Sequence, residues 1–248
     1  MRTLIFSLSV LSISVLGIRP LTGQIALDLE TGVVNTGYNN VRIPGDGGTL
    51  FSLKNDLKAS PEFFYRIRVN YTIGKRHTLS GLFAPLTTSY NGRVAGDINF
   101  EGVTFPSNTD LTGTYKFNSY RLTYRYEIVQ SEKLDFGLGF TAKIRDAKIA
   151  LASPGLESEK TNVGFVPIIN FRLLWHLDEK FGLLVEGDAL AAPQGRAEDV
   201  LIAVTYKLSD RFGLKAGYRL LEGGADNDEV YNFAFFHYAS VGLFVDLK

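Results

Sequence analysis

The connections between strand-like segments of this chain alternate between very short and long, from about residue 25 to the C-terminus. About ten such segments fit into this length. The short connections are polar and suit tight turns; they are Gly74-Lys75-Arg76, Gln130-Ser131-Glu132, Asp178-Glu179 and Ser209-Asp210-Arg211. The long connections differ from one another and cover residues 39–61, 91–113, 152–160, 193–198 and 222–230. Short turns on one side and long loops on the other predict an all-β, antiparallel up-and-down barrel that crosses a membrane with about ten strands.

The strand segments have a strict period of two, which places apolar residues on one face and polar residues on the other. Residues 163–177 are an example: the odd positions are apolar throughout, and the even positions include Asn170, Arg172 and His176. A soluble barrel has the same period with its apolar side inward, so alternation alone does not settle which face meets lipid. Aromatic residues near the short turns favour the membrane, because all lie on the apolar face as an interfacial girdle requires. These residues are Tyr71, Tyr126, Trp175, Phe181, Tyr206 and Phe212.

The first 23 residues differ from the rest and predict a secretory signal peptide. Arg2 supplies a positive start, residues 4–17 form a 14-residue apolar stretch with four serines, and Gly23 precedes a cleavage site at Gln24. The stretch is shorter than the roughly 17 to 25 residues of a membrane-spanning helix. Residues 24–248 are then one barrel domain. Cleavage removes two of the 26 basic residues and none of the 26 acidic ones, which leaves a net charge of −2 and gives no reason to expect a nucleic-acid partner.

The chain resembles small bacterial outer-membrane β-barrel proteins over its whole mature length, in addition to the signal segment. Residues 117–126 (FNSYRLTYRY) and 222–229 (EGGADNDE) look like stretches of uncharacterised members of that class. The resemblance implies the barrel fold and a place in the bacterial outer membrane, with membrane lipids, lipopolysaccharide and the barrel assembly machinery as partners and a monomer as the default state. It carries no catalytic residue. Such barrels often end on an aromatic residue, whereas this chain ends at Lys248, which leaves the register of the last strand open between Phe236, Tyr238 and Phe244 and their neighbours.

The polar faces predict a network of charges inside the barrel, with six acids and ten bases. A barrel of this size is largely filled by its own side chains, and buried charges need partners, which favours a salt-bridged plug. Arg172 with Glu186 and Arg68 with Glu30 are expected pairs on neighbouring strands. The excess of four bases supports the alternative of a narrow pore with a weak preference for anions. The predicted network comprises Asp28, Glu30, Arg66, Arg68, Arg121, Arg125, Glu127, Asp135, Lys143, Arg145, Arg172, Glu186, Asp188, Lys207, Lys215 and Arg219.

A membrane hydrolase acting on lipid or peptide is the third hypothesis, because ten strands is also the number of the omptin proteases. Such chemistry needs a histidine oriented by a carboxylate or placed beside a serine. His77 and His176 lie next to short turns, and His237 lies in the last strand, where Ser240 points to the opposite face. No catalytic set can be assembled from sequence neighbours. No motif indicates a metal or a cofactor. The sequence therefore predicts an outer-membrane barrel with a structural or surface-interaction role.

Overall fold

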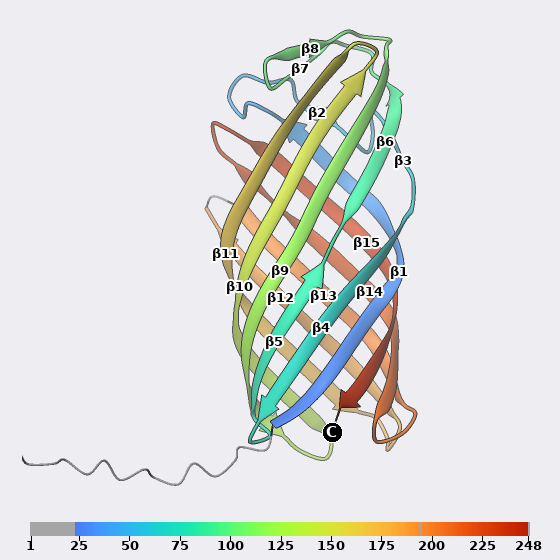
Figure 1. Cartoon of the computed structure of the whole chain (residues 1–248), viewed down its shortest axis with the longest axis vertical. Helices are drawn as coiled ribbons and strands as arrows, with labels where there is room; N and C mark the ends of the chain where they lie inside the picture. The colour runs from blue at the N-terminus through green and yellow to red at the C-terminus, as the bar shows by residue number, and fades with distance from the viewer. Residues whose placement is uncertain (1–22, 194, 248) are drawn as a thin grey trace, which may run out of the picture.

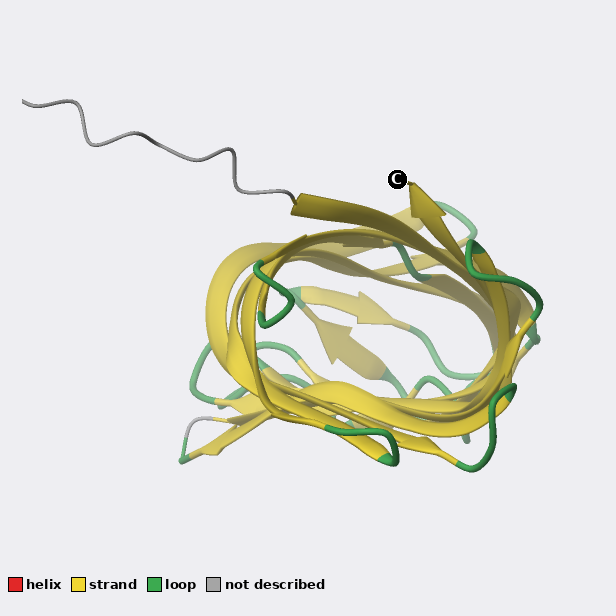
Figure 2. Ribbon diagram, turned by 90° about the horizontal axis from the view of Figure 1, so that it is seen from below, coloured by secondary structure: helices red, strands yellow, loops and turns green. Residues whose placement is uncertain are grey.

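The computed structural model describes residues 23–193 and 195–247. Its ten barrel strands are all antiparallel and form a closed barrel (Figure 2). Each strand pairs with its neighbours in sequence, and β15 pairs with β1 to complete the closure. The described residues contain no helix that could cross a membrane. The barrel strands are β1 (Gly23–Arg42), β4 (Glu62–Ile73), β5 (His77–Ala84) continued by β6 (Thr87–Arg93), β9 (Asp110–Gln130), β10 (Leu134–Ser153), β11 (Leu156–His176), β12 (Phe181–Ala192), β13 (Gly195–Lys207), β14 (Phe212–Asp226) and β15 (Tyr231–Leu247).

β5 and β6 count as one barrel strand because both pair with β9, on either side of an interruption at Pro85 and Leu86. Proline has no N–H to donate to a ladder, which accounts for the break. Four further short strands lie in the long connections: β2 (Phe51–Ser52), β3 (Lys58–Ala59), β7 (Ile98–Phe100) and β8 (Val103–Phe105). β7 and β8 form a hairpin over one end of the barrel (Figure 1). The predicted fold class is confirmed.

Both ends of the barrel domain lie at the opposite end from this hairpin, beside the four short turns (Figure 1). In the first turn Gly74 and Lys75 adopt left-handed conformations, with φ of 58° and 70°. In the third, the Asp178 carboxylate accepts hydrogen bonds from the backbone N–H groups of Lys180 and Phe181, each at 2.7 Å. We call this the periplasmic end. The predicted signal peptide lies outside the described residues except for Gly23, which opens β1.

Several predicted long loops are in fact short, because the strands continue beyond the apolar segments from which they were recognised. β10 and β11 pair up to Ser153 and Leu156, so a turn at Pro154 and Gly155 replaces the predicted loop 152–160. Gly155 has a φ of 78°, which favours glycine there. β12 and β13 likewise run to Ala192 and Gly195, so the predicted loop 193–198 is also wrong. The strands were recognised by their apolar, lipid-facing residues. This pattern ends where a strand leaves the membrane, so it did not show how far each strand continues.

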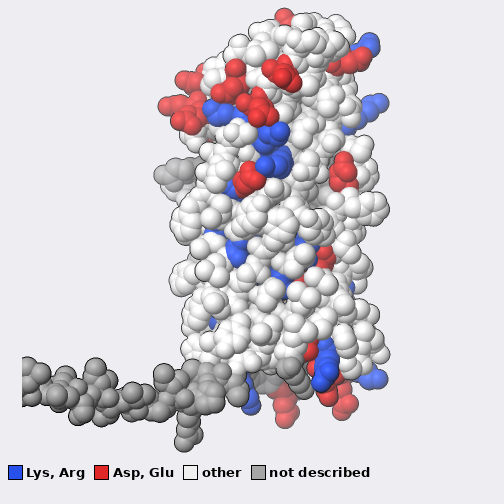
Figure 3. Space-filling model, in the orientation of Figure 1, with Lys and Arg blue, Asp and Glu red and all other residues white. Residues whose placement is uncertain are grey.

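An apolar belt covers the outside of the barrel between its two ends. Charged side chains gather at the ends, and the surface between them is mostly uncharged on the face shown (Figure 3). Outward residues such as Phe140 and Phe165 are 72% and 67% exposed, which is the reverse of a soluble barrel. Five of the predicted girdle residues (Tyr71, Tyr126, Trp175, Phe181 and Phe212) are exposed at the periplasmic end, and Tyr206 is half-buried there against the Phe181 ring, with centroids 4.9 Å apart.

The last strand has Phe236, Tyr238 and Ser240 on its inner face and Val241 on the outer face. Phe244 also turns inward, because the Lys215 ammonium lies 4.8 Å from its ring centre. A register shift between Thr36 and Tyr38 of β1 accompanies this arrangement. The shift is a local irregularity of the kind that a simple period of two does not reveal.

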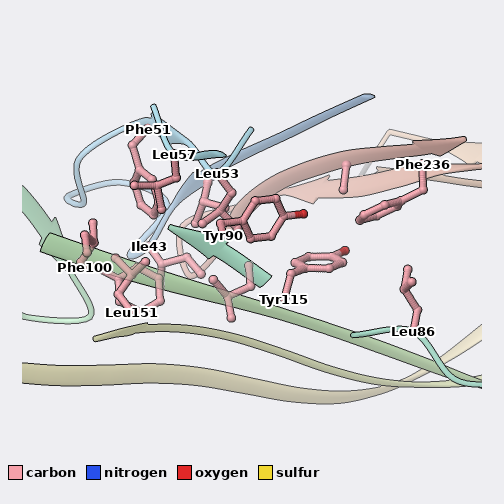
Figure 4. Close-up of a cluster of buried hydrophobic side chains, with 14 of the residues drawn as sticks. Ile43, Phe51, Leu53, Leu57, Leu86, Tyr90, Phe100, Tyr115, Leu151 and Phe236 are labelled. Carbon is pink, nitrogen blue, oxygen red and sulfur yellow. The ribbon is translucent and has the colours of Figure 1, made fainter. Parts of the chain in front are cut away.

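The half of the barrel away from the periplasmic turns is filled by a hydrophobic core. The first long loop folds inward here and contributes Ile43, Leu53 and Leu57, and the β7–β8 hairpin adds Phe100 and Phe105 (Figures 1 and 4). These side chains are at most 2% exposed. We call this region the upper core. It packs around inward residues of the barrel strands, which include Tyr90, Tyr115, Leu151 and Phe236 (Figure 4).

The barrel wall has uneven height. β9, β10 and β11 are 21, 20 and 21 residues long, whereas β12 and β13 have 12 and 13. β11 pairs with β12 only from Ile169 to His176, so its upper half has β10 as a partner on one side and no paired strand among the described residues on the other. One side of the barrel therefore stands higher than the other (Figure 1).

Candidate functional site: a charge network across the lumen

Asp199 of β13 is the centre of an ion network that crosses the barrel. Its carboxylate receives Arg66 Nη2 at 2.8 Å, Arg121 Nη2 at 2.5 Å and Arg219 Nη1 at 2.6 Å. These arginines come from β4, β9 and β14. β9 and β13 are separated by three strands on one side and five on the other, so the bond between Arg121 and Asp199 spans the lumen. All four side chains are at most 6% exposed.

A second group of ion pairs joins β1 to β14. Arg219 holds Glu30 through Nε and Nη2, both at 2.7 Å, which is the bidentate geometry that guanidinium groups favour. Lys215 Nζ lies 2.8 Å from Asp28 and 3.2 Å from Glu30. Arg219 therefore links this group to Asp199, and the two groups form one continuous network.

Asp188 of β12 extends the network toward β9, β10 and β11. It accepts from Arg121 Nη1 at 2.6 Å, from the Thr141 hydroxyl at 2.6 Å and from the Asn170 amide at 3.0 Å. Thr141 also shares a hydrogen bond with Thr123 at 2.7 Å. Neutral polar groups thus complete the hydrogen bonding of the buried Asp188 carboxylate.

Glu186 does not form the single close ion pair with Arg172 that the sequence predicts. Arg172 lies opposite it in the β11–β12 register, as expected, but their closest approach is 3.9 Å. Arg68 and Lys215 lie as near, each at 3.7 Å, and Arg219 lies at 3.9 Å. Glu186 therefore balances several cations at once. The predicted pair of Arg68 with Glu30 is wrong: Arg68 lies opposite Asp28, and Glu30 is opposite Arg66 and bound by Arg219.

The remaining predicted network residues form no ion pair with Asp188 or Asp199. Arg125 and Glu127 form a buried pair at 2.8 Å. Asp135 contacts His176 at 2.9 Å near the periplasmic end. Lys143 is 2% exposed on the inner face of β10, where it lies opposite Arg121 of β9. Arg145 is half-buried two residues farther up the same face.

Lys207 corrects the prediction, because it does not lie in the enclosed lumen. Its side chain is 55% exposed at the periplasmic end of β13, where its ammonium lies 2.8 Å from Asp210 of the adjoining turn. Lys207 does follow the inward parity of β13, but it is the last residue of the strand. Parity gives the direction of a side chain and not whether the barrel encloses it.

Asp199 is the network member that the sequence analysis missed. It shares the inward parity of Leu201 and Ala203, both buried, but it lies next to residues that were assigned to a loop. Continuing the period of two by one step from Leu201 toward that loop would have found it. Adding Asp199 and removing Lys207 changes six acids and ten bases to seven acids and nine bases, so the excess of bases falls from four to two.

The three histidines lie outside the upper half of the lumen. His77 shares a hydrogen bond with the Tyr124 hydroxyl at 2.8 Å, and His237 with the Tyr218 hydroxyl at 2.5 Å, both on exposed surfaces. His176 has the carboxylate partner Asp135, a pair from neighbouring strands that sequence order conceals. It lies at the periplasmic end, away from the long loops.

Comparison with known proteins supports the fold and no closer relationship. No family model matches the chain, and no curated protein matches it. The outer membrane protease OmpT of Escherichia coli matches with a TM-score of 0.52 and 10% identity, over 90% of this chain and 97% of that one. This is the fold of a small bacterial outer-membrane β-barrel protein. The apolar belt and the girdle agree with location in the outer membrane.

Two other solved outer-membrane proteins are less similar to this chain. Ail, the attachment invasion locus protein of Yersinia pestis in complex with a heparin analogue, has a TM-score of 0.41 and 11% identity, over 90% of this chain and 99% of that one. An outer membrane channel from Pseudomonas putida F1 has a TM-score of 0.43 and 10% identity, over 95% of this chain and all of that one. The likeness to OmpT at 10% identity shows the fold alone, and a fold does not select a role.

Proposed function

We propose that this outer-membrane barrel is closed to solutes and has a structural or surface-interaction role. The observation that carries the proposal is the cross-lumen contact of Asp199 with Arg66, Arg121 and Arg219, which ties opposite walls of the barrel together. A conducting lumen would have to separate these groups. Removing one partner of a buried ion pair typically costs about 3 to 5 kcal/mol. Separating these ion pairs to open the lumen would therefore be unfavourable.

The upper core supports the same proposal as a second barrier in series. Its apolar side chains lie above the charge network and belong to loops as well as to barrel strands. Ions cross a dry apolar constriction poorly, which is how hydrophobic gates work in channels. The corrected count of acids and bases also halves the charge excess that favoured an anion-selective pore. The hydrolase hypothesis has less support, because the histidines lie on exposed surfaces and at the periplasmic end.

Conductance of the refolded protein in planar lipid bilayers tests this proposal. We expect the wild-type barrel to give no stable current steps. The double variant Asp199→Ala with Arg121→Ala removes the cross-lumen contact and should raise the frequency of current steps if the network contributes to closure. A porin inserted under the same conditions controls for the sensitivity of the bilayer. Regular ohmic steps from the folded wild-type protein would refute the closed barrel and favour the narrow pore.

The surface role would belong to the part of the barrel above the belt. Here ion pairs line the outside of the tall strands, such as Lys148 with Glu159 at 3.1 Å and Lys116 with Asp146 at 2.8 Å. Arg196 binds Glu222 at 2.6 Å. These charged groups would contact lipopolysaccharide, and the apolar belt below them would contact the surrounding membrane lipids. The barrel assembly machinery as a partner during biogenesis, and a monomeric state, complete the proposal.

A further inference from the structure

A cavity of about 340 Å³ lies inside the barrel, above the charge network. This volume is at the low end of the range of about 300 to 1,000 Å³ for small-molecule sites. Its walls are mainly apolar and come from opposite sides of the barrel; they include Phe117, Ile149, Val166, Leu190, Leu221 and Phe236. The Phe236 side has the upper core behind it. A mostly apolar cavity with a few polar groups is the usual form of a ligand site.

Two cations of β10, Lys143 and Arg145, face this cavity and form no salt bridge with a carboxylate of the described residues. Lys143 is 2% exposed, and its ammonium lies 4.8 Å from the centre of the Phe117 ring. Arg145 hydrogen-bonds to the Asn162 amide oxygen, but its Nε is buried with no partner. The other basic residues that border the cavity have carboxylate partners. Lys160 pairs with Glu101 at 3.0 Å, and Lys148 and Arg196, which border the cavity from the outer face of their strands, pair with Glu159 and Glu222.

The acidic residues of the cavity lie at its upper rim. Glu222 is held by Arg196 and by the Tyr38 hydroxyl, and Glu229 lies in the exposed connection before β15. Neither is paired with Lys143 or Arg145 in the structure. Burying a cation that has no carboxylate in direct contact is costly, so an anion in contact with Lys143 and Arg145 would offset part of that cost.

The wall between β11 and β12 is incomplete beside the cavity. Their ladder stops at Ile169 opposite Ala189, and the cavity is bounded above that point by Val166 on one strand and Leu190 on the other. The backbone N–H of His176 points toward the β10 side, where it donates to the carbonyl of Lys133, the residue before β10. Because N–H directions alternate along a strand, odd positions of β11 face β12, and Pro167 has no N–H to offer there. Phe165 and Val163 border the break on the lipid side.

From these observations we infer that the cavity binds an amphiphile with one alkyl chain and an anionic headgroup of the free carboxylate class. The headgroup lies against Lys143 and Arg145, and the alkyl chain occupies the apolar walls. The molecule enters from the membrane through the break between β11 and β12. The inference names a ligand class for the proposed surface-interaction role. The charge network only closes the lower side of the cavity and does not contact the ligand. The conductance test and the ligand-binding test can therefore fail independently.

Decanoate binding, measured by calorimetry on the barrel in phosphatidylcholine nanodiscs, tests the inference. After subtraction of partitioning into empty nanodiscs, we expect saturable binding at one molecule per barrel. Lys143→Met keeps the length of the side chain and removes its charge, and should weaken decanoate binding about 10- to 100-fold, the usual worth of a charged hydrogen bond. Ala147→Phe fills the cavity and should abolish binding. Lys207→Met, at the periplasmic end, is the matched control and should bind as the wild type does.

Uncharged 1-decanol separates headgroup recognition from simple apolar filling. It should bind the wild type more weakly than decanoate does, and should not respond to Lys143→Met. Equal affinities for the two compounds would overturn the inference. So would unchanged decanoate binding by a Lys143→Met variant that is folded, as shown by different migration of its unboiled and boiled samples on a gel. Loss of decanoate binding in phosphatidylglycerol nanodiscs would show that an anionic membrane lipid is the occupant, and would overturn the free carboxylate.

A disulfide across the break tests the entry route, because the chain has no native cysteine. Ile168→Cys with Leu190→Cys places one cysteine on each strand at the next position of the interrupted register, both on the inner face. We expect the oxidised double variant to bind decanoate several-fold more slowly than the reduced one, with the rate restored by reductant. Equal rates in the two states would overturn entry through the wall.

Discussion

Asp199→Asn should destabilise the barrel more than any other single amide substitution in the network, because it leaves three arginines without their shared carboxylate. The side chain keeps its shape, so the loss is one of charge in a site where the four groups are at most 6% exposed. Removing one partner of such a buried pair typically costs about 3 to 5 kcal/mol. Arg121 and Arg219 retain Asp188 and Glu30, whereas Arg66 has Asp199 as its carboxylate partner.

Arg66→Met therefore makes a matched second variant. Alone it removes one of three contacts from Asp199 and should cost about 1.5 to 3 kcal/mol, the usual range for a hydrogen bond to a charged group. Combined with Asp199→Asn it restores the balance of charge, and the double variant should cost less than the sum of the singles by about 0.5 to 3 kcal/mol, as for groups in one network.

Urea unfolding of the barrel from lipid vesicles measures these differences. Asp110→Asn is the control: Asp110 pairs with Arg93 at 2.5 Å on the exposed surface, and its loss should leave the urea midpoint unchanged. If Asp199→Asn and Arg66→Met each cost under about 1 kcal/mol and add independently, water screens these charges. The lumen would then be solvated, and the reasoning from burial would be refuted.

The other predictions concern the fold and the ends of the chain. The closed hydrogen-bond network should survive detergent below boiling, so unboiled and boiled samples should migrate differently on a gel; identical migration of folded protein would contradict the closed barrel. Protein from outer membranes should begin at or near Gln24 by N-terminal sequencing, and a retained Met1 would defeat the signal peptide. The pKa of Asp178 is lowered by hydrogen bonds from the Phe181 and Lys180 backbones. Its turn should therefore be most stable above the ordinary aspartate pKa and weaken as the pH falls through the lowered value; NMR titration checks this, and Asp178→Asn should remove the dependence.

Much of the fold was available from the sequence because lipid imposes a simple rule on each strand. Wherever a strand faces the bilayer, its outer residues must be apolar, and Phe140, Phe165 and Trp175 obey this at a fixed period. Tight turns add their own residue preferences, so the four periplasmic turns were also correctly placed. The inward side of each strand then follows from parity, which placed Asp28, Arg121 and Arg219 inside the barrel, where they are buried.

The partners within the network could not be predicted, because they are set by contacts across the lumen. Parity fixes direction, and heights from the turns suggest neighbours, but neither relates β9 to β13. The bond from Arg121 to Asp199 joins residues 78 positions apart on strands that are not paired. The upper core was missed for a related reason. Ile43, Leu53 and Phe100 lie in segments without a strand period, and only the closed barrel brings them together.

The upper core gives a way to locate the membrane surface from the chain itself. In β10, outward Phe140 and Ile144 are apolar, but a few residues later it is inward Ile149 and Leu151 that are apolar. β9 makes the same change between Tyr115 and Tyr120. Below this point a strand obeys the rule of a protein dissolved in lipid, and above it the rule of a protein dissolved in water. In β9 and β10, the position at which the alternation reverses its phase therefore marks the level at which the outer leaflet ends.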